Sequence, residues 1–179
     1  MANLLHLPCR NEDGDLRVVV ESPRGSRVKL DYDPVEQTFE LGRPLNLGIA
    51  YPYDWGFIPS TRAPDGDPLD AMVYHDYPTY PGVVIAVKAI GVVRVVQKDP
   101  GEKRERNDRI IAVPVDEKRW DDATQLQKRI RRELEDFFVI VTSMTGKKVR
   151  VEGWEGPKMA LAAIEKAAKA YERGKGKKP

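Results

Sequence analysis

The chain has 179 residues, of which 41% are hydrophobic and 32% charged, a balance typical of one globular domain and not of a disordered or membrane-embedded chain. Thirty basic residues against 28 acidic ones leave a net charge of only +2, which argues against nucleic acid or an anionic membrane as a partner. The single cysteine excludes an internal disulfide and a thiolate-rich zinc site. Because the N-terminus lacks the pattern of a secretory signal, we expect a cytoplasmic protein.

Short runs rich in β-branched residues, separated by Gly, Pro and charged clusters, predict antiparallel strands. The predicted strands are residues 16–20, 27–32, 83–90, 91–96 and 109–115. Residues 42–70 are rich in Gly, Pro and aromatic residues, which indicates an irregular, packed segment where functional groups tend to collect. The charged segment 97–108 is interpreted as an exposed hairpin tip.

Two helices are predicted after the strands. The first spans residues 122–138, where apolar residues recur at helical spacing, and Asp121 or Asp122 would cap it. The second spans residues 157–173, begins with a proline and stops at Gly174. Its alanine-rich face would pack either on the protein's own barrel or in an interface between subunits.

Many short strands followed by two helices predict an α+β, mainly β protein, in which a small barrel carries the helices on its outside. We expect residues 1–179 to form a single domain, with a core over about residues 16–173. Residues 174–179 are rich in Gly and Lys and are predicted to be a solvated basic tail.

The segment Asp-Gly-Asp-Pro-Leu-Asp at residues 65–70 places three carboxylates within six residues. Gly66 permits backbone angles closed to other residues and Pro68 fixes one, so a rigid turn can aim the carboxylates at one point. Carboxylate oxygens are hard ligands that suit Mg²⁺, Mn²⁺ or Ca²⁺. A calcium loop of the EF-hand type is excluded, because the positions that require Gly and Glu hold Asp70 and Asp76. The alternative to a cation site is an ordinary solvated turn.

Mg²⁺ binds through few carboxylates together with substrate phosphates, so a magnesium site predicts cations elsewhere in the chain. The candidates are Lys29, Arg43 and Arg109. Each would be a solvated surface charge if taken alone. Together with the aspartates they predict a phosphate-handling site.

The motifs "VKLDYD", "YPYDWGFIPST", "DGDPLDAMV", "DPGE", "IIAVP" and "VEGW" occur in the order found in soluble inorganic pyrophosphatases of the family I type, which the chain resembles over about residues 16–170. The resemblance implies a five-stranded OB-like barrel with two peripheral helices. It also implies hydrolysis of pyrophosphate to two phosphates by a metal-bound hydroxide. Several Mg²⁺ ions per site are expected, with Mn²⁺ as an alternative, and a homo-oligomer, with a hexamer favoured.

The resemblance also implies roles for individual residues. The metal ligands would be Asp65, Asp70, Asp99, Glu21 and Asp31, and Asp70 would bridge two ions. Asp67 would accept the proton of the attacking water, with Tyr51 in the same catalytic network. The substrate would be held by Lys29, Arg43, Trp55, Arg109 and Lys147.

The acidic side departs from the family pattern at several positions. Asp31 stands where the family usually has Glu, and Trp55 replaces a Tyr and so lacks the hydroxyl. Asn107 stands where the family has an Asp that binds metal. We expect Asp108 to replace that ligand through a shift of the loop by one residue, since the chain has extra residues there.

The phosphate-binding side departs further. Val141 and Thr142 occupy the place of a Tyr-Lys pair that grips phosphate in the family. Lys147 or Lys148 would fill this gap, or both are exposed lysines at a strand end.

These departures leave an alternative open, a catalytically weak relative that binds metal and phosphate without fast turnover. An OB-like oligonucleotide binder is disfavoured, because the aromatic residues cluster beside acidic ones and the net charge is close to zero. For His75 we expect a structural role and not a catalytic one.

Overall fold

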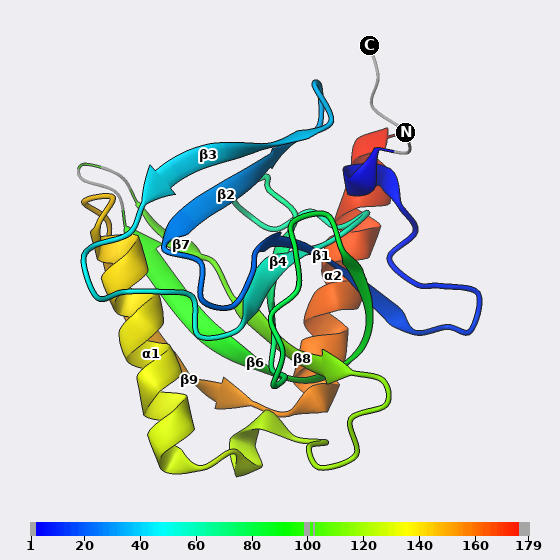
Figure 1. The fold of residues 1–179 in the computed structure, drawn as a ribbon. Helices are drawn as coiled ribbons and strands as arrows, with labels where there is room; N and C mark the ends of the chain where they lie inside the picture. Colours follow the sequence, from blue (N-terminus) through cyan, green and yellow to red (C-terminus); the bar gives the residue numbers. More distant parts are fainter. Residues whose placement is uncertain (1–2, 99–100, 102, 176–179) are drawn as a thin grey trace.

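The computed structural model describes residues 3–98, 101 and 103–175. Five strands close into a ring, since the first pairs with the last (Figure 1). In ring order they are β1 (Leu16–Ser22), β4 (Asp54–Ile58), β5 (Leu69–Val73), β8 (Arg109–Pro114) and β6 (Val84–Lys98). Neighbours are antiparallel except β5 and β8, which run parallel. The ring and the two long helices confirm the predicted α+β, mainly β class with an OB-like barrel.

Strand β6 is one continuous strand of 15 residues, although two strands were predicted. Its pairing register with β8 shifts between Ala89 and Gly91, which lets the strand bend without ending. Gly91 is needed at this bend, because a Cβ there would lie 2.5 Å from the Cβ of Ala123 and 2.7 Å from the carbonyl oxygen of Glu155. The far half of β6 pairs with β7 (Arg104–Arg106) and β9 (Lys148–Glu155), which extend the sheet beyond the ring.

Strands β2 (Val28–Asp33) and β3 (Thr38–Pro44) form a separate two-stranded sheet, called the ribbon below (Figure 1). The expectation that residues 42–70 are irregular is wrong in part, because β4 and the start of β5 lie within this range. All five residues of β4 are buried, so its pattern is a continuous run and not the alternation that identifies a half-buried strand.

Helix α1 spans Lys128–Ser143, so the predicted range 122–138 is wrong at both ends. Before the helix, the short 3-10 turn η2 (Ala123–Gln125) uses Asp122 as its cap, with the side chain accepting from the Thr124 amide at 2.8 Å. A similar short turn, η1 (Leu4–His6), begins the described chain. Helix α2 (Pro157–Lys175) begins at the predicted proline and continues past the predicted stop at Gly174.

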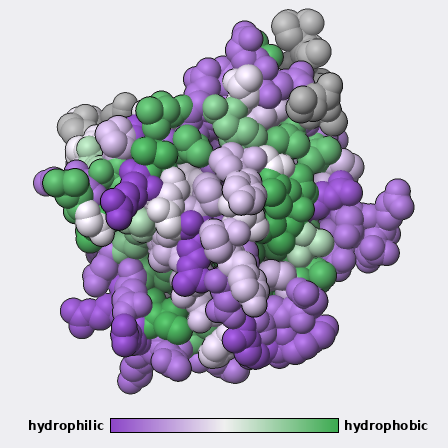
Figure 2. Space-filling model, viewed as in Figure 1, coloured by the Kyte–Doolittle hydropathy of each residue, from purple (hydrophilic) through white to green (hydrophobic). Residues whose placement is uncertain are grey.

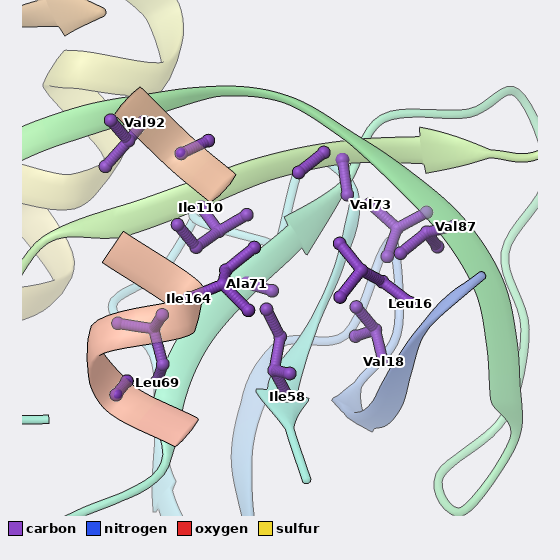
Figure 3. Close-up of a cluster of buried hydrophobic side chains, with 14 of the residues drawn as sticks. Leu16, Val18, Ile58, Leu69, Ala71, Val73, Val87, Val92, Ile110 and Ile164 are labelled. Atoms are coloured by element: carbon purple, nitrogen blue, oxygen red, sulfur yellow. The ribbon is translucent and has the colours of Figure 1, made fainter. Parts of the chain in front are cut away.

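Two hydrophobic clusters hold the helices on the ring. Alternate residues of the strands divide between them, so that Ala71 belongs to the first cluster and Met72 to the second. Helix α2 contributes Ala160, Ile164 and Ala167 to the first cluster, in which Ile164 is labelled in Figure 3. The alanine-rich face of α2 therefore packs on the protein's own barrel.

The second cluster takes its helical side chains from α1, namely Leu134, Phe137 and Phe138. On α2, Met159 and Leu161 are exposed. Figure 2 shows a largely hydrophilic face with apolar side chains gathered in separate patches. Across the described ranges, no helix is both long and apolar enough to cross a membrane.

Candidate active site

A cleft of about 800 Å³ lies between the ring, the ribbon and the C-terminal end of α1. It brings together most of the residues that the sequence predicts for the site. The predicted residues that line it are Glu21, Lys29, Asp31, Arg43, Tyr51, Trp55, Asp65, Asp67, Asp70, Arg109 and Lys147. The predicted ligand Asp99 lies outside the described residues.

The acidic turn, residues 65–70, is fixed by hydrogen bonds from the chain just before it. The amide of Ala63 donates to the Asp67 carbonyl at 2.7 Å. The buried hydroxyl of Thr61 accepts from the Leu69 amide at 2.9 Å and donates to the carbonyl of Ile58, the last residue of β4. Gly66 has a φ of 97°, a left-handed conformation that other residues rarely adopt. The turn therefore holds its carboxylates in fixed directions.

The carboxylates of the acidic turn disfavour one another's charge. Burial raises the pKa of Asp65, and the nearby charge of Asp67 raises it further. Burial also raises the pKa of Asp70, and Asp65 adds to this increase, while Arg109 and Lys29 oppose it. A cluster of this kind is stabilised by cations.

Glu21 of β1 and Tyr51 also line the cleft with shifted pKa values. Burial raises the pKa of Glu21 to about 8, although its carboxylate accepts a hydrogen bond from the Tyr32 amide at 3.0 Å. The negative charges of Asp70 and Asp31 contribute to this increase. Burial raises the pKa of Tyr51 to about 12, so its hydroxyl keeps its proton at neutral pH.

The cationic side chains of the cleft come from separate elements. Lys29 in β2 pairs with Asp31, its neighbour on the same strand. Arg43 in β3 donates to the carbonyl of Val141 at 2.8 Å and so reaches from the ribbon to the end of α1. Lys147 enters the cleft from the turn between α1 and β9.

Arg109 at the start of β8 is buried and lies closest to the acidic turn. Its Nη1 contacts both the carboxylate of Asp70 and the side-chain oxygen of Asn107. Its guanidinium carbon lies 5.2 Å from the ring centroid of Trp55, a cation–π contact.

The structure does not bring Asp108 into the cleft, contrary to the expectation that it replaces the missing ligand. Its carboxylate accepts from Arg94 at 2.5 Å, from the Val95 amide at 3.2 Å and from Arg106 at 3.2 Å. Successive residues of an extended chain point in opposite directions, so Asn107 and Arg109 line the cleft while Asp108 faces away.

Several lining residues are absent from the predicted site. They are Gln97, Glu105, Phe137, Phe138 and Thr145, among others. Gln97 is only 7% exposed and continues the buried alternation of Val93 and Val95 in β6. The sequence signal for Gln97 is a polar residue at the third position of a buried series, but the charged residues that follow it resemble an exposed hairpin tip.

The donor set suits a hard divalent ion that keeps part of its water. Within the residues that the structure describes, no three His, Cys, Asp or Glu side chains converge as a ready-made metal cage. Mg²⁺ does not need one, since it binds through one or two carboxylates, water and substrate phosphates. Asp65 and Asp70, with pKa values raised chiefly by burial and further by neighbouring carboxylates, fit this requirement.

A five-stranded OB-like barrel that sets an acidic turn against lysine and arginine side chains is suited to a hydrolase of phosphate compounds. The family model described as inorganic pyrophosphatase matches residues 18–172. The chain therefore belongs to the family I soluble inorganic pyrophosphatases, as the sequence motifs indicated.

Individual relatives agree with this assignment over nearly their whole length. The inorganic pyrophosphatase of Synechocystis sp. is 34% identical over 94% of this chain and 99% of its own. That of Thermus thermophilus is 35% identical over 96% of this chain and 99% of its own. A crystal structure of the Thermus thermophilus enzyme superposes with a TM-score of 0.85, and one from Helicobacter pylori with 0.82 at 28% identity.

Proposed function

We propose that this protein hydrolyses inorganic pyrophosphate to two phosphates with Mg²⁺ as its cofactor, and that Mn²⁺ can substitute. The observation that carries the proposal is the cleft itself, in which the carboxylates of residues 65–70 face Lys29, Arg43 and Arg109. Pyrophosphate is highly anionic, so its cleavage needs charge neutralisation more than covalent catalysis. Family membership supports the substrate and a divalent metal in general.

The side chains of the acidic turn divide into two roles. Asp65 and Asp70 would hold the divalent ions, with Glu21 and Asp31 completing the carboxylate side. Bound divalent ions supply Lewis acidity, which makes water a better nucleophile at neutral pH. Asp67 would accept the proton of the attacking water, because its carboxylate lies in the same cleft between the two ligands in sequence.

The cationic side chains would bind the phosphate oxygens of substrate and products. Arg43 and Arg109 offer planar forks that match phosphate, while Lys29 and Lys147 act as point charges. Tyr51 keeps its proton and can donate a hydrogen bond to a phosphate oxygen. The ring of Trp55 would hold Arg109 in position through the cation–π contact.

Release of phosphate from pyrophosphate in the presence of Mg²⁺ tests the proposal. We expect turnover by the parent protein and a loss of at least about 100-fold in Asp67→Asn, since general-base catalysis contributes roughly this factor. Asp13→Asn is the matched control, because it makes the same chemical change at an exposed carboxylate outside the cleft. Equal rates for the parent and Asp67→Asn would refute the proposed role.

A catalytically weak binder of metal and phosphate is the second candidate function. Val141 and Thr142 line the cleft and provide no positive charge, and Asn107 provides no negative one. If the parent releases no phosphate above Asp67→Asn, Mg²⁺-dependent binding of imidodiphosphate, measured by calorimetry, would support this second function.

We also infer a homo-oligomer, with a hexamer favoured by the family resemblance, in the cytoplasm. Exposed apolar side chains on both helices support association, namely Val139, Ile140, Met159 and Leu161. Analytical ultracentrifugation measures the assembly, and a monomer at micromolar concentration would contradict the inference. Fractionation of cells tests the location.

A further inference from the structure

Arg109 is the cation that already occupies the acidic side of the cleft. Its side chain is almost fully buried, with 8% of it exposed to solvent. One nitrogen, Nη1, contacts both the Asp70 carboxylate and the side-chain amide oxygen of Asn107. The face of the Trp55 ring supports the guanidinium at 5.2 Å.

Two other cations of the cleft, Lys29 and Arg43, have partners outside the acidic turn. Lys29 pairs with Asp31 and remains one-third exposed, with 33% of its side chain open to solvent. Arg43 donates to the backbone carbonyl of Val141. Among the described ion pairs, Arg109 with Asp70 is the only one that includes an aspartate of residues 65–70.

We propose that Arg109 is the resident counter-ion of the metal site and competes with the divalent ion for Asp70. The proposal rests on the proposed metal-dependent function. The Asp70 oxygen that accepts from the guanidinium is a poorer metal ligand, because one of its lone pairs is engaged. Two cations a few ångströms apart also repel strongly where water is scarce. We therefore expect Arg109 to withdraw from Asp70 when the site is loaded.

The contacts of Arg109 with Trp55 and Asn107 determine where the withdrawn guanidinium stays. Neither contact involves Asp70, so both hold the guanidinium in the cleft after the ion pair breaks. A planar guanidinium stacks well on an indole, and its fork suits phosphate oxygens. Metal loading would thus free Arg109 for the substrate, which sets an order in which the metal binds before pyrophosphate.

Isothermal titration of the metal-free protein with Mg²⁺ tests the competition without any measurement of turnover. Arg109→Met keeps the length of the side chain and removes its charge, so we expect its first Mg²⁺ to bind about tenfold more tightly than in the parent. Arg109→Lys keeps the charge and is the matched control, with an affinity within about threefold of the parent. Equal or weaker binding by Arg109→Met would overturn the proposal.

A second measurement uses the parent protein, because a buried substitution can impair folding. The Nε–H resonance of Arg109, assigned by its loss in Arg109→Lys, should shift as Mg²⁺ is added and follow the calorimetric binding curve. A resonance that stays fixed at saturating Mg²⁺ would overturn the proposal.

The two proposals can fail separately. If the parent releases phosphate with Mg²⁺ while Arg109→Met gains no affinity, only the competition is wrong. If the parent neither binds Mg²⁺ nor releases phosphate, and Arg109→Met also binds none, both are wrong.

Discussion

Replacing Glu21 with glutamine should remove a pH dependence from the stability of the metal-free protein. The pKa of Glu21 is about 8 in the folded protein, chiefly because of burial, against an ordinary value of 4.5. Between pH 4.5 and 8 the folded protein therefore keeps a proton that the unfolded chain releases. Stability must fall as pH rises through this window, since the folded state binds more protons.

The difference between these two pKa values corresponds to about 5 kcal/mol of unfolding free energy. Glu21 is only partly shielded from the water in the cleft, which solvates the ionised carboxylate, so we expect about 2 kcal/mol. The charges that face Glu21 are Asp70, Asp31 and Lys29, and both aspartates remain in the variant. Glu21→Gln keeps the size of the side chain and has no proton to release.

Urea unfolding at a series of pH values from 5 to 8.5, with chelator present, measures the effect. The stability of Glu21→Gln minus that of the parent should rise with pH and level off above pH 8. Other titrating groups are common to both proteins and cancel in this difference. A difference that stays constant, or that falls with pH, would refute the reasoning.

Three further predictions concern single substitutions. Burial alone would raise the pKa of Asp54, but hydrogen bonds from His75 and Thr79 lower it, so its stabilisation is present above about pH 4 and is lost in acid. Asp54→Asn should cost about 2–4 kcal/mol in urea unfolding at pH 7, and an unchanged midpoint would contradict this. Asp108→Asn should lower stability by about 1–3 kcal/mol but leave the number of bound Mg²⁺ ions unchanged in calorimetry, since its carboxylate pairs with Arg94 outside the cleft. Thr142→Lys adds a cation to the cleft and should lower KM for pyrophosphate about tenfold at low salt, whereas Ser143→Lys, on the next and exposed residue, should not.

The acidic turn could be predicted from sequence because all of its information is local. Residues 65–70 contain the carboxylates together with the Gly and Pro that orient them, and the structure places all three aspartates in the cleft. The motifs in their order also predicted the ring of strands and the enzyme family. Neither inference required the residue-by-residue pairing of distant segments to be known.

The sequence could not decide which of Asn107 and Asp108 lines the cleft, because this depends on how the two residues pair with strand β6. The amide of Asn107 bonds to the Val95 carbonyl, and the Val95 amide bonds to the Asp108 carboxylate. This register on β6 directs Asn107 into the cleft and Asp108 away from it. The order of charged residues along the chain does not show which of these side chains enters the cleft.

Strand β9 is absent from the predicted strands although its sequence contained a usable signal. Val149 and Val151 alternate with the exposed residues Lys148, Arg150 and Glu152, the period of a half-buried strand. The nearby glycines and lysines resemble a loop, and only pairing with β6 shows which pattern holds.

The carboxylates and the cations of the cleft are supplied by different parts of the fold. The carboxylates at residues 65–70 come from one short turn, whereas the cations come from the ribbon, from β8 and from the turn after α1. A substitution at the end of α1, as at Val141 or Thr142, can alter the affinity for anions while the acidic turn stays intact. The anion-binding side of the cleft can therefore change without a change in the carboxylate side.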